Sequence, residues 1–80
     1  VLVVEDEFLI ADELCMVLRD AGADVIGPVG HIEAALAHAA DAEPIDAAVL
    51  DLNLAGVPAY PVADVLARRA VPMVFSTGYD

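Results

Sequence analysis

The sequence contains no lysine and no tryptophan, and its only permanent cations are Arg19, Arg68 and Arg69. Fourteen Asp and Glu residues give a formal net charge of −11. So few cations cannot neutralise several phosphates, which argues against direct DNA or RNA binding by this segment. The acidity favours cations and basic protein surfaces as partners, although a solvated acidic surface accounts for most of the charge.

Cysteine is also scarce, since Cys15 is the only one in these 80 residues. It has no internal disulfide partner, and its place in a helical pattern makes it a candidate core residue rather than a nucleophile. This usage suits a reducing compartment, and we expect a cytoplasmic protein. Mean hydropathy is +0.71, yet no apolar run approaches the ~18 residues that span a bilayer. No signal-peptide pattern is visible, so a membrane partner is not expected.

Apolar periodicity and helix-breaking residues predict four strands alternating with three helices. The expected strands are 1–4, 23–29, 45–51 and 71–76, and the expected helices are 8–21, 31–42 and 61–69. Gly27-Pro28 and Gly30 are expected to end the second strand, and residues 52–59 to form a loop. Strands that alternate with helices require right-handed crossovers, so the sequence predicts the α/β class with a doubly wound parallel sheet.

Polar residues stand where three of these strands end. Glu5 and Asp6 follow the first strand, Asp51 ends the third and Thr77 follows the fourth. In a sheet ordered 2-1-3-4 the first and third strands are neighbours. The topological switch point, where open sheets bind ligands, lies between them. The sequence therefore predicts that three carboxyl groups and one hydroxyl converge at this edge.

Such a set suits a divalent cation and a phosphoryl group. Clustered carboxylates repel one another, and Mg²⁺ or Mn²⁺ bound by oxygen ligands removes that cost. Asp6 and Asp51 are the expected direct ligands, Asn53 would add its backbone carbonyl, and Glu5 would act through a metal-bound water. Asp51 could also attack phosphorus, with the Thr77 hydroxyl bonding the resulting phosphoryl group. Taken singly, such residues more often cap helices or turns, so the prediction depends on the set.

Three segments resemble the receiver domains of two-component response regulators. They are VLVVEDE at 1–7, VLDLNL at 49–54 and PMVFSTGY at 72–79. The resemblance implies a flavodoxin-like, CheY-like fold with strand order 2-1-3-4-5. Residues 1–80 would form one receiver domain that lacks the last helix, strand and helix. The segment 25–37 also resembles stand-alone receivers that pair with bacterial sensor histidine kinases.

The resemblance assigns roles to individual residues. Glu5 and Asp6 match the acidic pair, with Glu in place of the usual first Asp. Asp51 matches the phospho-acceptor, and Asn53 the residue whose carbonyl binds the metal. Thr77 matches the switch hydroxyl, and Gly78 matches the small residue that controls access to the phosphoryl group. The Lys and the aromatic switch residue of the family do not occur in this segment.

The resemblance implies a signalling switch rather than an enzyme, with at most autophosphorylation from small phosphodonors and autodephosphorylation. Its partners would be a sensor histidine kinase or phosphotransfer protein and a downstream protein. One alternative is a metal-dependent phosphatase or phosphotransferase that forms an aspartyl phosphate. The best-known such family resembles DxDx[TV], and Asn53 occupies its second acidic position. The other alternative is an interaction module that works without phosphorylation.

The strand at 71–76 is apolar, and we expect it to form a sheet edge. On the first helix, Ile10, Leu14, Val17 and Leu18 recur at helical spacing, and part of this stripe would lack a neighbour. A large exposed apolar patch favours association. Residues 1–80 made alone are therefore expected to aggregate, to be unfolded or to self-associate through 71–76.

Overall fold

The computed structural model describes residues 1–41 and 43–76 of the chain. The elements in chain order are β1 (Leu2–Val4), α1 (Phe8–Asp20), β2 (Ile26–Val29), α2 (Ile32–Ala40), β3 (Ala48–Asp51), β4 (Asn53–Leu54), β5 (Val57–Pro58), α3 (Tyr60–Arg68) and β6 (Met73–Ser76). The predicted α/β class is therefore confirmed.

Four strands form one sheet in the order β2-β1-β3-β6. All three pairings are parallel. Counted among the expected strands this order is 2-1-3-4, so the predicted topology is confirmed. The three residues of β1 are fully buried, as a central strand covered on both faces requires.

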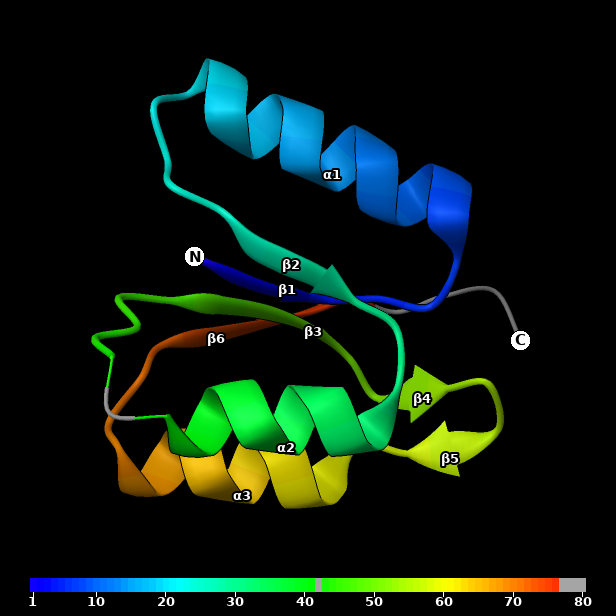
Figure 1. Ribbon diagram of the computed structural model, residues 1–80, viewed down its shortest axis with the longest axis vertical. Coiled ribbons are helices and arrows are strands. Elements are labelled where there is room, and N and C mark those ends of the chain that lie inside the picture. The colour runs from blue at the N-terminus through cyan, green and yellow to red at the C-terminus, as the bar shows by residue number, and fades with distance from the viewer. Residues whose placement is uncertain (42, 77–80) are drawn as a thin grey trace.

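Helices cover the two faces of the sheet unequally (Figure 1). Helix α1 lies on one side, and α2 and α3 lie together on the other. Side chains alternate between faces along a strand. Leu2 and Val4 of β1 belong to the larger core with Leu50 of β3, on the side of α2 and α3. Val3 points the opposite way, toward α1. The α2–α3 layer therefore anchors the central strands from one side.

Helix α1 leaves part of its apolar stripe exposed, as the sequence predicted. Its fully buried residues are Ala11 and Cys15, which confirms the core position of the cysteine. Ile10 and Val17 remain 38 % and 61 % exposed. The small side chains allow close approach to the sheet, and the larger apolar residues lie on the helix flank beside them. The expected stripe is thus only partly buried.

The second strand differs from its prediction. Gly27 and Pro28 do not end it but lie inside β2. Gly27 has φ +109°, and a Cβ there would lie 2.8 Å from the Val3 carbonyl oxygen, so only glycine fits without displacement. The register between β1 and β2 shifts at this point. Proline is tolerated because β2 is an edge strand.

The expected loop at 52–59 contains a small antiparallel hairpin of β4 and β5. Its turn residues Ala55 and Gly56 have φ values of 52° and 87°, as in the two-residue turns that match strand twist. The Asn53 Oδ1 accepts a hydrogen bond from the Gly56 N–H at 2.8 Å. The hairpin lies beyond the carboxyl end of β3 (Figure 1).

Helix α3 begins at Tyr60 with Pro61 in its first turn, as predicted. It runs alongside α2 (Figure 1). Arg69, just after its end, joins the two helices. Its Nη1 donates to the Ala39 carbonyl at 2.6 Å, and its Nη2 donates to the Glu43 carbonyl at 2.8 Å. Among the helices described here, none is long and apolar enough to cross a membrane.

We expect Arg69→Met to lower the free energy of unfolding by about 1–2 kcal/mol, because two hydrogen bonds from a charged donor are lost while the apolar stem is kept. Urea denaturation measures this change. Arg68→Met is the matched control, because Arg68 is exposed on the same helix end. Equal stability of the two variants would show that Arg69 does not hold the helices together.

Candidate functional site

Three carboxylates meet at the carboxyl edge of the sheet. Glu5 and Asp6 follow β1, and Asp51 ends the neighbouring β3. One oxygen from each lies within 4.8 Å of the other two. Within residues 1–41 and 43–76, this is the only such group of three acidic, histidine or cysteine side chains. The three carboxylates therefore converge at this edge, as the sequence predicted.

Two of the carboxylates are held by the turn that follows them. The Glu5 Oε1 accepts the Glu7 N–H at 3.1 Å, and the Asp51 Oδ1 accepts the Asn53 N–H at 3.0 Å. Each of these hydrogen bonds joins a side chain to the backbone N–H two residues later, so the chain turns immediately after the strand. Glu5 is 4 % and Asp51 9 % exposed. Local backbone donors thus orient two nearly buried acids.

Asp6 is exposed and is held differently. Its Oδ2 accepts a hydrogen bond from the Ala55 N–H at 2.9 Å, across 49 positions of the sequence. This bond connects the end of β1 to the turn of the β4–β5 hairpin. Ala55 cannot be identified from the sequence, because a backbone donor carries no side-chain signature, and only the adjacent Gly56 indicates a turn.

The electrostatics of the site favour a cation. Burial raises the pKa of Glu5, and the neighbouring charges of Asp51 and Asp6 raise it further, while the Glu7 N–H opposes the change. The ionised cluster is therefore destabilised by desolvation and like-charge repulsion. A positive charge between the carboxylates would relieve both effects. Carboxylate oxygens suit a hard divalent cation such as Mg²⁺.

The other predicted site residues are Asn53, Thr77 and Gly78. Asn53 lies in β4, and both its N–H and its Oδ1 make the hydrogen bonds described above. The metal-binding role of its carbonyl stays a prediction. Thr77 and Gly78 lie outside the described residues.

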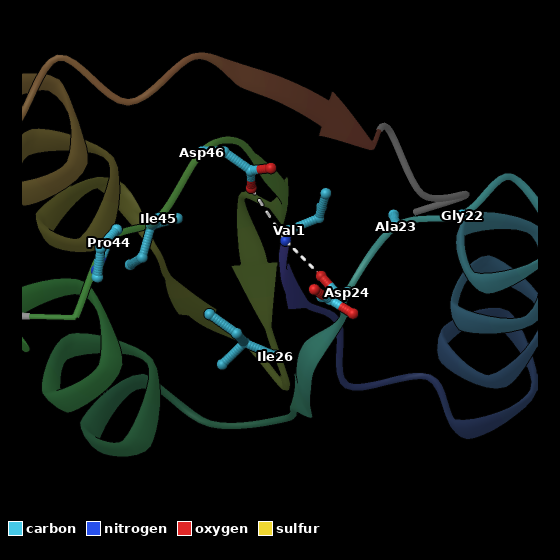
Figure 2. Close-up of a pocket in the computed structure, with 8 residues that line it drawn as sticks. All are labelled: Val1, Gly22, Ala23, Asp24, Ile26, Pro44, Ile45 and Asp46. Carbon is cyan, nitrogen blue, oxygen red and sulfur yellow. Dashed lines mark hydrogen bonds and ion pairs between the residues drawn. The ribbon is translucent and has the colours of Figure 1, made fainter.

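A separate pocket of about 420 Å³ opens at the opposite edge of the sheet (Figure 2). Val1, Asp24 and Asp46 line its polar part. The Val1 ammonium lies 3.1 Å from the Asp46 carboxylate and donates to the Asp24 carbonyl at 2.6 Å. This pocket contains no convergence of three ligands comparable to the carboxylate cluster, so the chemistry of the chain points to the carboxyl edge.

No family model matches the chain, and no curated protein matches its sequence. One solved structure does: the BeF3-activated conformation of SdrG from Pseudomonas melonis Fr1, determined in solution. The two sequences are 45 % identical, and the structures superpose with a TM-score of 0.77 over 99 % of this chain and 67 % of the SdrG chain. SdrG is a response-regulator receiver.

The chain belongs to the receiver domains of two-component response regulators. The resemblance first noted in three short motifs is thereby confirmed over nearly the whole chain. This receiver domain has the sheet order β2-β1-β3-β6 and carries the cluster of Glu5, Asp6 and Asp51.

The raised pKa of Glu5 predicts a pH dependence of stability in metal-free buffer. The folded receiver domain holds the Glu5 proton more tightly than the unfolded chain does. The contribution of Glu5 to the free energy of unfolding is therefore largest below the pKa of Glu5 in the unfolded chain, about 4.3. This contribution is lost as pH rises through the higher pKa of Glu5 in the folded domain.

Urea denaturation between pH 4 and 8 with a chelator tests this in Glu5→Gln. The variant should gain stability relative to the parent as pH rises. Glu13→Gln, which removes an exposed acid on α1, is the control and should follow the parent. If the difference in unfolding free energy between Glu5→Gln and the parent did not change with pH, the raised pKa of Glu5 would be contradicted.

Proposed function

We propose that this receiver domain is a phospho-accepting switch of a two-component phosphorelay, with Asp51 as the acceptor. The observation that supports this most is the position of Asp51. It ends central strand β3, is nearly buried, and lies within 4.8 Å of Glu5 and Asp6. A carboxylate there is oriented by the Asn53 N–H and surrounded by groups suited to a cation.

The proposed step is an in-line displacement at phosphorus. The Asn53 N–H binds Asp51 Oδ1, so the second oxygen, Oδ2, is the proposed nucleophile. Its bond to phosphorus forms as the P–N bond of a phosphohistidine breaks, and that electron pair stays on the imidazole nitrogen. Hydrolysis then transfers the phosphoryl group to water. This regenerates the Asp51 carboxylate and releases inorganic phosphate.

The carboxylates of Asp6 and Asp51 would hold the cation, with the Asn53 carbonyl as a further ligand and Glu5 acting through a water. A bound Mg²⁺ or Mn²⁺ would neutralise charge on the phosphoryl oxygens. Without it, the phosphoryl group would meet three carboxylates and be repelled.

Thr77 and Gly78 complete the proposal through the family resemblance. The Thr77 hydroxyl would donate a hydrogen bond to the phosphoryl group on Asp51, and Gly78 would leave room for it. Phosphorylation adds roughly −1.5 to −2 charges and new acceptor oxygens. That change is the proposed signal.

The proposed partners are a sensor histidine kinase or phosphotransfer protein upstream and a protein target downstream, in the cytoplasm. The domain would be a switch rather than a turnover enzyme. A small-molecule phosphatase of the DxDx[TV] type is disfavoured because Asn53 stands where its second acid is needed. Residues 1–80 are proposed to act as part of one receiver domain.

Asp51→Asn should abolish phosphorylation of the protein by a small phosphodonor in the presence of Mg²⁺, because an amide is not the nucleophile that a carboxylate is. Intact-protein mass spectrometry measures the added phosphoryl group. Asp64→Asn, an exposed acid on α3, is the control and should label like the parent. Undiminished labelling of Asp51→Asn would sink the assignment.

Asp6→Ala should remove most of the rise in melting temperature that Mg²⁺ produces in the parent. At ten times its Kd, a cation that binds only the folded state adds about 1.4 kcal/mol. Differential scanning calorimetry with and without Mg²⁺ measures the effect. Glu7→Ala removes a neighbouring acid outside the cluster and should keep the full response. If both variants respond alike, Asp6 is not a ligand.

A further inference from the structure

The bond between Asp6 and Ala55 joins the acidic cluster to the β4–β5 hairpin. Of the three clustered acids, Asp6 is the exposed one, so burial does not fix its carboxylate. The Ala55 N–H does so from a segment far along the chain. A carboxylate offers about four lone-pair positions, so one such bond leaves room for a cation.

The turn that carries this donor is poorly supported by its own sequence. Ala55 adopts φ +52°, a left-handed conformation that residues other than glycine and asparagine rarely take. The paired segments β4 and β5 have two residues each, and an isolated two-stranded hairpin is at best marginally stable. Two hydrogen bonds to side chains hold the tip: the Gly56 N–H donates to Asn53 Oδ1, and the Ala55 N–H donates to Asp6 Oδ2.

We propose that Ala55 is a positioning residue for the cation site and that the β4–β5 hairpin and a cation at Asp6 stabilise each other. An ordered hairpin presents the Ala55 N–H, which restricts the Asp6 carboxylate to an orientation near Glu5 and Asp51. Such coupling is reciprocal. If ordering of the hairpin raises the affinity for the cation by some factor, cation binding shifts the hairpin toward its ordered state by the same factor. This inference rests on the proposed function, because it requires cation binding at Asp6.

Two substitutions should change the stability of the hairpin in opposite directions, and neither removes a carboxylate. Asn53→Ala deletes the side-chain acceptor for Gly56 and should loosen the tip, while its backbone carbonyl stays. Ala55→Asn keeps the N–H and places the residue that best tolerates this conformation before Gly56, so it should tighten the tip. His38→Ala, an exposed change on α2, is the control.

The test is a Mg²⁺ titration of the full-length protein and of each full-length variant, followed through backbone amide resonances by NMR. The Kd for Mg²⁺ should rise in Asn53→Ala and fall in Ala55→Asn by about two- to tenfold, the range that one hydrogen bond supplies. The Kd of His38→Ala should match the parent. In the parent, Mg²⁺ should slow hydrogen exchange of the Ala55 amide, and Asp6→Ala should abolish that protection.

The possible failures are distinguishable. Mg²⁺ binding with the same Kd in the parent and in both hairpin variants would overturn this inference and leave the proposed function standing. Tighter binding by Asn53→Ala would overturn it too, because the hairpin would then compete with the cation. A parent protein that does not bind Mg²⁺ would overturn the cation site of the proposed function and this inference with it. Unchanged circular dichroism of the variants would exclude misfolding as the cause of a changed Kd.

Discussion

Electrostatic repulsion among three carboxylates is the constraint around which this domain is organised. Glu5 and Asp51 are nearly buried, and Asp6 stands beside them. In water these groups would separate, but here the neighbouring strands β1 and β3 hold them together. The fully buried core on the side of α2 and α3 supplies the rigidity for this. Burial raises the pKa of Glu5, and the charges of Asp51 and Asp6 raise it further.

Backbone hydrogen bonds determine how the repelling groups are arranged. Each of the three acids accepts one N–H, from Glu7, Asn53 or Ala55. Two of these donors lie in the turn just after the acid, and the third comes from a distant hairpin. The similarity to SdrG covers nearly the whole chain, so this arrangement is embedded in a fold shared with a known receiver domain.

The parallel sheet and the acidic cluster could be predicted, because both depend on the types of residue in the strands and at the strand ends. The alternation of apolar strands with helices predicted the parallel sheet. The acids Glu5, Asp6 and Asp51 at the ends of two strands predicted the cluster, since parallel strands present their carboxyl ends at one edge. The β4–β5 hairpin could not be predicted, because its strands are two residues long and its Ala55-Gly56 turn lacks the usual Asn-Gly signature. Helix α1 leaves Ile10 and Val17 of its apolar stripe exposed, as expected for a stripe that partly lacks a neighbour.

Strand pairing in this sheet ties the acidic cluster to the core. Leu2 pairs with Ile26 on one side and with Ala48 on the other, so β1 closes a shorter loop and a longer one. The longer loop has the larger entropic cost of closure, but a doubling of loop length adds only about 0.6 kcal/mol. Glu5 and Asp51 come together only when the pairing of β1 with β3 is made. The same pairing brings Leu2 and Val4 together with Leu50 in the core, so the sheet cannot form this part of its core without bringing the two acids together.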